Sequence, residues 1–324
     1  MNGPIRQMAI AIFAIFLLLA GAATYQQVIA GPDYRDDPRN ARLLAGRAGR
    51  ERGTIITADG VVVATSQADP DDPRVFRRTY PEDGLYAHVV GYATQLFGST
   101  GLESAWAGQL VTDRDATISG VINAILGDDL RPRGLRLTID HDLQQAAADA
   151  LGDQIGSVVA IDPDTGAILA MVSNPTFNPN SLLGTGAGPI GTQLDEDPSQ
   201  PLLNRAVAET YPPGSVFKII TATAALETGI AGPGTSYPDP LELALPGSTA
   251  TIRNFDRGVC ADGETVTLAE AFRRSCNTTF GQIGIQLDAD PLVSSAEAYG
   301  FNLEIPLDLR VLPSVIPDVA SFAN

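Results

Sequence analysis

A helix that is apolar on almost every side constrains the fold of this chain more than any other feature. Residues 216–228 have a helix-forming composition and are followed by Gly229, which is typical of a helix end. Their apolar members are not confined to one stripe: Ile219, Ile220, Ala222, Ala224, Ala225 and Leu226. Such a helix is predicted to lie buried in the centre of a domain, with the other elements packed around it.

The start of this helix carries the only lysine of the chain, Lys218, three residues after Ser215. All other basic residues are arginine, which does not release its proton in a protein, whereas a partly buried lysine can act as a base. Positions i and i+3 share a helix face, so the amine can reach the serine hydroxyl. The helix N-terminus would add N–H donors for a developing oxyanion, and apolar surroundings would lower the lysine pKa. An ordinary helix cap beside a surface lysine is the alternative, because Ser-x-x-Lys alone is common.

The size and charge of the chain limit the number of domains and the kinds of partner that it can have. Its 324 residues are enough for two domains or one large one, and a hydrophobic content of 44% can supply a core. The net charge is −17, which disfavours nucleic acid as a partner, because nucleic-acid-binding proteins are expected to be basic. Hairpin signals and helical patterns occur in the same chain, so we expect an α+β fold.

An unbroken apolar run extends from Met8 to Ala23, close to the roughly 20 residues that span a bilayer. We interpret residues 1–30 as a cytoplasmic tip and transmembrane anchor, and residues 31–51 as a polar tether. A signal peptide cut near residues 20–22 is the alternative, because the small residues there resemble a cleavage site. Either interpretation places the body of the protein on the extracytoplasmic side of the plasma membrane.

Two cysteines fit that location. Cys260 and Cys276 are 16 residues apart, and an even count in an exported chain permits one disulfide. Two small buried thiols are the alternative. No Cys-x-x-Cys pair or His/Cys cluster occurs, so we expect no metal site.

Residues 52–136 are predicted to form a small α+β module. The β-prone residues 53–57 and 61–64 flank an Asp-Gly turn, which is a strong hairpin signal. A helix is predicted over residues 101–111.

Residues 137–324 are predicted to form a second domain. The apolar runs 157–161 and 167–172 bracket an Asp-x-Asp-x-Gly string at residues 162–166. We interpret this string as the turn of a second hairpin rather than as a calcium loop.

Helices and a long loop complete the second domain. Asp140 can cap a helix over residues 143–151, and further helices are predicted to start near residue 268 and to cover residues 277–287. Residues 174–201 are predicted to form a loop. Its glycines lack the strand-to-helix setting of a phosphate site: Gly184, Gly186 and Gly188.

Several motifs together resemble those of class B penicillin-binding proteins, most of all the actinobacterial penicillin-binding protein A type. Residues 211–218, Tyr-Pro-Pro-Gly-Ser-Val-Phe-Lys, are similar to the active-serine motif, and residues 275–277, Ser-Cys-Asn, to the second motif. Residues 52–55, Arg-Gly-Thr-Ile, resemble the start of the non-catalytic module. Residues 137–140, 160–166 and 174–180 resemble the opening of the transpeptidase domain.

The resemblance implies an architecture. It consists of a membrane anchor, a non-catalytic pedestal or dimerisation module over residues 52–136, and a serine-β-lactamase/transpeptidase-like domain from residue 137, with a helical cluster against an antiparallel sheet. The partners it implies are peptidoglycan stem peptides, β-lactams and other proteins of cell-wall synthesis or division. No cofactor is implied.

The resemblance also implies catalytic roles. Ser215 would attack the penultimate D-Ala carbonyl of a stem peptide, and Lys218, as a free amine, would take its proton. Ser275 would relay a proton between Lys218 and the leaving group, and Asn277 would hold the substrate amide and the lysine. A helix cap is the structural alternative for Ser275 and Asn277, and it is compatible with catalysis. A disulfide from Cys276 would brace the second motif.

One departure from the family is serious. Its third motif, Lys-Thr/Ser-Gly on a strand, is absent, because Lys218 is the only lysine. We interpret the 324 residues as C-terminally truncated, and we expect them alone to bind no penicillin and to fold poorly.

Other functions fit less well. One alternative is a binding module, either a β-lactam sensor or an inactive scaffold that recruits partners in wall assembly. A sensor would be expected to carry several membrane spans, and one is seen here. A class D-type β-lactamase shares Pro-Gly-Ser-x-Phe-Lys, but the module before the domain argues against it. A Ser-His-Asp hydrolase is poorer still, because Ser215 lacks a Gly-x-Ser-x-Gly setting and because His88 and His141 have the pattern of surface or turn residues.

Overall fold

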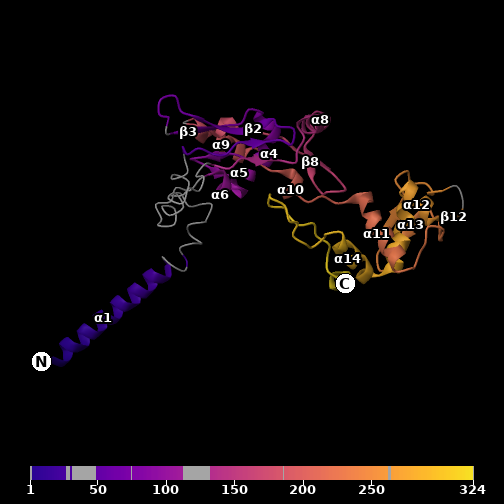
Figure 1. Ribbon diagram of the computed structural model, residues 1–324. Coiled ribbons are helices and arrows are strands. Elements are labelled where there is room, and N and C mark those ends of the chain that lie inside the picture. The colour runs from indigo at the N-terminus through magenta and orange to yellow at the C-terminus, as the bar shows by residue number, and fades with distance from the viewer. Residues whose placement is uncertain are drawn as a thin grey trace. The chain divides into compact units, whose positions relative to one another are not determined.

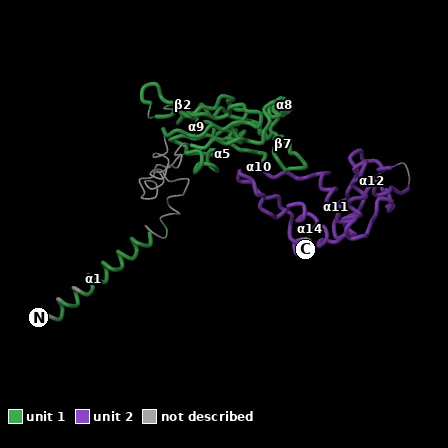
Figure 2. Tube along the Cα trace, viewed as in Figure 1, with its two compact units in different colours: residues 1–206 green, residues 207–324 purple. Residues whose placement is uncertain are grey.

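The computed structural model describes residues 2–26, 30, 49–73, 75–111, 132–184, 186–261 and 264–323. By internal contacts the chain divides into two compact units, residues 1–206 and 207–324 (Figures 1 and 2). This division does not test the domain boundaries expected from the sequence, which stay a prediction. Most of the tether expected over residues 31–51 lies outside the described residues.

The apolar run near the N-terminus forms one continuous helix, α1 (Asn2–Thr24). The stretch of residues 6–24 is long and apolar enough to cross a membrane, and none of it is buried. Among the described residues it is the one helix that meets this test.

A four-stranded sheet in the order β3-β2-β1-β6 organises the start of the first unit. The hairpin expected on either side of the Asp-Gly turn is confirmed, since β1 and β2 pair antiparallel, and β6 joins β1 in parallel. A Cβ on Gly53 would lie 2.0 Å from the Arg133 carbonyl oxygen, so only glycine permits this close approach. The strands are β1 (Ile55–Ile56), β2 (Val62–Ala68), β3 (Phe76–Thr79) and β6 (Leu135–Arg136).

Short elements follow the sheet. The single helix expected over residues 101–111 is wrong, because α5 and α6 are separated at Trp106, whose ψ of 19° interrupts the helix. The elements are η2 (Asp83–Tyr86), α4 (Ala87–Val90), β4 (Ala93–Thr94), β5 (Gly98–Ser99), α5 (Gly101–Ala105) and α6 (Ala107–Leu110).

A buried ion network crosses this part of the first unit. The Glu103 carboxylate is fully buried and accepts from Arg52 Nε at 2.7 Å and from Arg78 Nε at 2.5 Å. The Tyr80 hydroxyl lies 3.3 Å from the same carboxylate. Because these residues come from separate segments, the network ties α5 to the sheet.

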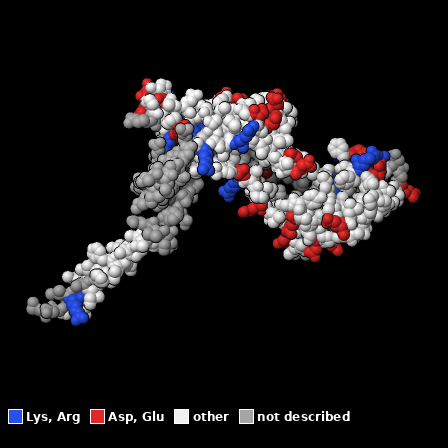
Figure 3. Space-filling model, viewed as in Figure 1, with Lys and Arg blue, Asp and Glu red and all other residues white. Residues whose placement is uncertain are grey.

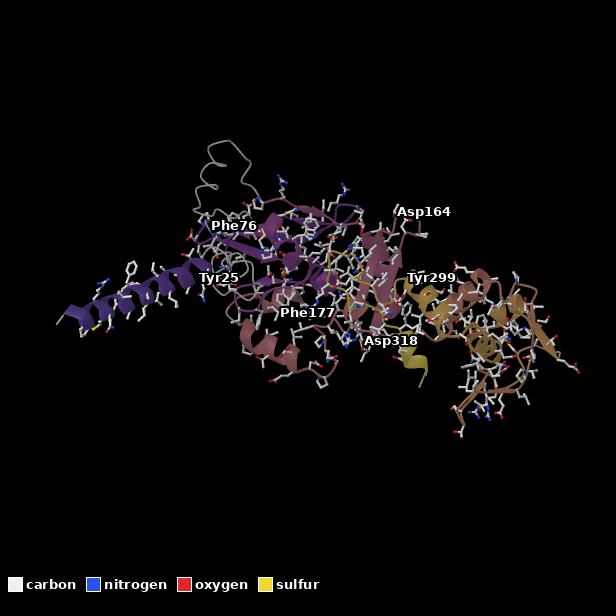
Figure 4. All side chains as sticks on the ribbon, turned by 90° about the horizontal axis from the view of Figure 1, so that it is seen from below. Tyr25, Phe76, Asp164, Phe177, Tyr299 and Asp318 are labelled. Carbon is white, nitrogen blue, oxygen red and sulfur yellow. A yellow bond between two sulfur atoms is a disulfide. The ribbon has the colours of Figure 1, made fainter. Side chains whose placement is uncertain are left out.

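The second hairpin expected from the sequence is confirmed by β7 (Gly156–Ile161) and β8 (Ile168–Asn174), which pair antiparallel. The Asp-x-Asp-x-Gly string is the turn between them, with Gly166 at a φ of 73° and Asp164 at the tip (Figure 4). Helix α8 (His141–Leu151) precedes the hairpin, and the Asp140 side chain caps it by accepting from Leu143 N at 2.9 Å.

The loop expected over residues 174–201 is wrong, because it contains a ten-residue helix, α9 (Ala187–Glu196), and the turn η3 (Pro179–Leu182). Pro189 lies in the first turn of α9, where no helical N–H is needed. Gly191 faces the Phe97 ring, and a Cβ there would lie 2.2 Å from Phe97 Cζ. A proline and a glycine in this stretch are therefore compatible with helix initiation and packing.

The surface position expected for His88 is also wrong. His88 is 9% exposed in α4, its Nε2 lies 2.8 Å from the Pro201 carbonyl oxygen, and its ring meets Phe177 edge-on. Burial lowers the pKa of the His88 imidazole. His141 is partly exposed as the first residue of α8.

The second unit is a group of helices with small antiparallel strand pairs, β10-β11 and β9-β12, and it begins within the short helix α10 (Arg205–Ala208). The helix expected over residues 277–287 is confirmed with those bounds. The elements are η4 (Gly214–Val216), α11 (Phe217–Glu227), β9 (Ser236–Pro238), β10 (Glu242–Ala244), β11 (Thr251–Arg253), β12 (Thr265–Thr267), α12 (Leu268–Arg274), α13 (Asn277–Leu287), α14 (Ala289–Ala298) and η5 (Val319–Ala323).

Helix α11 is packed on two sides and exposed elsewhere among the described residues, so the expectation of burial all round is wrong for them. Ala224 and Ala225 lie in the core with Phe280 and Ile283 of α13, whereas Ile219 is 45% exposed. On another side, α14 packs against α11, and the hydroxyl of Tyr299, labelled in Figure 4, lies 2.9 Å from Thr223 Oγ1.

Candidate active site

A tight turn presents Ser215 at the start of α11. Gly214 has a φ of 56°, a conformation that glycine adopts without a steric penalty. The turn η4 then runs directly into α11, so the hydroxyl of Ser215 and the amine of Lys218 lie one turn apart and 3.0 Å from each other. This local pair has the i,i+3 geometry that the sequence predicts.

The connection between α12 and α13 supplies the other half of the site. Ser275 ends α12 in the left-handed region, with φ 62° and ψ 44°, which is uncommon for a residue with a Cβ. The chain reverses there and starts α13 at Asn277. As a result the Ser275 hydroxyl and carbonyl and the Asn277 amide all face Lys218.

Lys218 Nζ is surrounded by four oxygen atoms. It lies 3.0 Å from Ser215 Oγ, 3.0 Å from the Ser275 carbonyl oxygen, 2.9 Å from Ser275 Oγ and 2.6 Å from Asn277 Oδ1. The two serine hydroxyls are themselves 3.1 Å apart. The structure thus brings together all four residues for which the sequence suggests a catalytic role.

The chemical nature of these oxygens decides where the lysine proton goes. The Ser275 carbonyl oxygen and Asn277 Oδ1 can only accept hydrogen bonds. When these two oxygens accept the two N–H bonds of a neutral amine, its one lone pair is left for a serine hydroxyl, Ser215 Oγ or Ser275 Oγ. Half-burial of Lys218 lowers its pKa through desolvation, which favours this neutral form. The arrangement therefore prepares the amine to take a proton from Ser215.

The orientation of the Asn277 amide is fixed from its other end. Asn277 Nδ2 donates to the Arg253 carbonyl oxygen at 2.9 Å, which leaves Oδ1 toward Lys218. The reversed amide would place a nitrogen donor against the amine and an oxygen against a carbonyl, so the hydrogen bonds select one orientation. Sequence reasoning missed Arg253, because a contact through its backbone carbonyl leaves no signal in residue type.

A disulfide joins Cys276, between Ser275 and Asn277, to Cys260 in the preceding loop, with the two Cα atoms 5.6 Å apart. The Asp239 carboxylate, which is 5% exposed, accepts from the backbone N–H of Cys260 at 2.8 Å and of Ala261 at 2.7 Å. The second motif is therefore held to a loop that is itself anchored.

Charges near the surface are mostly acidic. Figure 3 shows Asp and Glu side chains spread over the visible face of each unit, with fewer Lys and Arg. Among the described residues no group of three or more His, Cys, Asp or Glu side chains could hold a metal ion.

Two family models match the chain: the penicillin binding protein A dimerisation domain over residues 52–134, and the penicillin binding protein transpeptidase domain over residues 156–311. The peptidoglycan D,D-transpeptidase PbpA of Mycolicibacterium smegmatis is 41% identical over the whole chain, which covers 67% of that protein. The Mycobacterium tuberculosis PbpA is 40% identical over 99% of the chain and is likewise covered to 67%.

Solved structures agree with these matches. Penicillin-binding protein A from M. tuberculosis, solved as an imipenem acyl-enzyme complex, superposes with a TM-score of 0.75 and 39% identity over 84% of this chain and 65% of the other. Pseudomonas aeruginosa PBP2 superposes with a TM-score of 0.69 and 28% sequence identity, over 84% of this chain and 60% of the other. The chain spans 60 to 67% of the length of these proteins.

Proposed function

Because the chain belongs to the penicillin-binding protein transpeptidase family, we propose that the protein is a peptidoglycan D,D-transpeptidase whose nucleophile is Ser215. The observation that carries this proposal is the set of oxygen atoms around Lys218 Nζ. Two of them, the Ser275 carbonyl oxygen and Asn277 Oδ1, can only accept hydrogen bonds, which would leave the lone pair of a neutral amine for the Ser215 hydroxyl at 3.0 Å. A serine with a base 3.0 Å away is equipped for acyl transfer.

In the first half of the reaction, Ser215 Oγ attacks the carbonyl carbon of the penultimate D-Ala of a stem peptide while its proton passes to Lys218 Nζ. The C–N bond to the terminal D-Ala then breaks, and the leaving amine receives the proton through Ser275 Oγ. That hydroxyl is in contact with both Lys218 and Ser215, as such a relay needs. The products are free D-Ala and an ester on Ser215.

In the second half, the amine of a neighbouring stem attacks the ester and loses a proton to the same relay. Ser215 Oγ recovers a proton as its bond to the acyl carbon breaks, and a peptide cross-link results. Asn277 holds Lys218 through Oδ1 and keeps one N–H of Nδ2 for the substrate amide, because Arg253 uses only one.

β-Lactams are the expected inhibitors, because their strained amide mimics the D-Ala-D-Ala end and leaves a stable ester on Ser215. The M. tuberculosis relative is described as an acyl-enzyme with imipenem, with ceftriaxone and with penicillin G. Helix α1 would anchor the protein in the plasma membrane with its body on the extracytoplasmic side, where other proteins of wall synthesis, division or cell shape would be its partners.

The proposal is tested by labelling the full-length protein with a fluorescent penicillin. Wild type should be labelled to one equivalent, and Ser215→Ala should not be labelled at all, because it lacks the hydroxyl that would form the ester. Labelling of Ser215→Ala at the wild-type rate would reject Ser215 as nucleophile. Release of cross-linked product from a D-Ala-D-Ala stem peptide then distinguishes a transpeptidase from a β-lactam sensor, which would be acylated without turnover.

A further inference from the structure

Asn254 is a buried polar residue for which the proposed reaction gives no role. It follows β11 directly and is 7% exposed. Its Oδ1 accepts from the backbone N–H of Asn277 at 2.8 Å, from that of Thr278 at 3.2 Å and from Thr278 Oγ1 at 3.4 Å. Its Nδ2 donates to the Gly258 carbonyl oxygen at 3.0 Å. One side chain thus connects the loop after β11 to the first turn of α13.

Helix α13 needs this contact because it has no cap of its own. Its N-cap residue is Cys276, whose side chain makes no capping hydrogen bond because its sulfur is in the disulfide with Cys260. The first N–H groups of a helix lack partners within the helix and are costly when buried. Asn254 supplies the missing acceptor from 23 residues earlier in the chain, in place of a local Ser, Thr, Asp or Asn.

The hairpin that carries Asn254 is packed tightly on the same helix. A Cβ on Gly281 of α13 would lie 2.8 Å from Leu243 Cδ2 and 2.9 Å from Ile252 Cδ1, so both side chains of the β10-β11 hairpin pack directly against the helix at this glycine. The end of β11 is therefore held at a fixed place beside the start of α13. From there the Arg253 carbonyl and the Asn254 amide together contact the residue that faces Lys218.

We propose that Asn254 is a positioning residue for acylation: by capping α13 from outside, it holds the Asn277 amide in the place and orientation that aim the Lys218 lone pair at Ser215. The inference rests on the proposed function. It extends that function, because Asn254 itself touches neither Lys218 nor Ser215 and acts through Asn277.

A double-mutant cycle on the full-length protein separates this role from ordinary stabilisation. Asn254→Ala, Asn277→Ala and the double variant are compared in penicillin acylation rate per titrated site and in thermal unfolding. Asn254→Ala alone should slow acylation about 10- to 100-fold, the effect of a displacement of about 1 Å in a catalytic group. In the Asn277→Ala background the same substitution should slow acylation by less than about threefold, because the amide it positions is gone.

The unfolding temperature should behave differently from the rate. Asn254 caps the backbone N–H groups of residues 277 and 278, and these survive in Asn277→Ala. Asn254→Ala should therefore lower the melting temperature by the same few degrees, about 2 to 8 °C, in both backgrounds. A rate effect that is non-additive beside a stability effect that is additive is the signature of a positioning residue.

Two controls complete the experiment. Asn254→Asp keeps an acceptor for the helix N-terminus and should restore acylation to within about fivefold of wild type. Gln282→Ala removes the anchor of α13 to the Pro238 carbonyl, a 3.0 Å hydrogen bond beyond the first turn, and should lower stability without slowing acylation. If Asn254→Ala does not fold, Asn254→Ser carries the same cycle with a shorter acceptor.

The outcomes are distinct. Loss of rate by the same factor with and without Asn277, or an unchanged rate in Asn254→Ala, overturns the inference while leaving the proposed function intact. Absence of acylation in the wild-type protein would instead reject the proposed function.

Discussion

Ser275 combines two properties that a pair of substitutions can separate. Its hydroxyl bridges Lys218 and Ser215, at 2.9 and 3.1 Å, and its backbone lies in the left-handed region with a φ of 62°. Ser275→Ala removes the hydroxyl and keeps the unfavourable backbone. Ser275→Gly removes the hydroxyl as well, but places at this position the one residue that adopts such a φ without a steric penalty.

The magnitudes expected for stability and rate differ. The left-handed conformation costs a residue with a Cβ roughly 1–2 kcal/mol, and the greater freedom of glycine in the unfolded chain cancels part of the gain. Ser275→Gly should therefore be about 1 kcal/mol more stable than Ser275→Ala. Proton transfer by a positioned group contributes about 10²- to 10⁴-fold, so both variants should acylate at least about 100-fold more slowly than wild type.

The assay compares chemical unfolding of the two variants with their rates of penicillin acylation, each normalised to the folded fraction. Equal stability of the alanine and glycine variants would show that the backbone at this position is unstrained. A wild-type acylation rate in Ser275→Ala would refute the proton relay, and a rate much higher in Ser275→Gly than in Ser275→Ala would show that strain, rather than the hydroxyl, had been limiting.

Two further predictions concern charge. Glu103→Gln leaves the guanidinium groups of Arg52 and Arg78 buried without their carboxylate, so it should destabilise the first unit by about 3–5 kcal/mol in thermal unfolding. As a control, Asp69→Asn loses an ion pair with the exposed Arg77 and should change the stability little. Equal effects of the two substitutions would contradict the buried network. Desolvation lowers the pKa of Lys218, and the neutral amine is the base. The acylation rate should therefore rise with pH, reach half its maximum below the ordinary lysine pKa of 10.5 and then level off. A half-maximal rate at or above pH 10.5 would contradict a desolvated base.

The sequence predicts the parts of this protein that depend on neighbouring residues. The Asp-Gly hairpin, the Asp140 cap and the bounds of α13 follow from local patterns, and each is confirmed. The contact between Ser215 and Lys218 follows from helix geometry alone, since only three residues separate them.

The features that sequence reasoning missed depend on residues distant along the chain. The packing of the Phe97 ring against Gly191 in α9 cannot be read from the residues beside the glycine. The burial of His88 depends on a carbonyl group 113 residues away. The cap that Asn254 provides has no local signature either, since an asparagine after a strand is ordinarily a turn residue.

The same distinction divides the chemistry of the site. The nucleophile and its base form a local pair, whose distance a short stretch of helix sets. The direction in which the base accepts a proton is set instead by the α12-α13 connection, which lies 57 to 59 residues further on. Substitutions in that connection, or in the hairpin that holds it, should therefore reduce acylation while the Ser215–Lys218 distance stays the same. A static contact between serine and lysine is then a necessary condition for activity and not a sufficient one, since an amine whose lone pair points elsewhere is equally close to the hydroxyl and cannot take its proton.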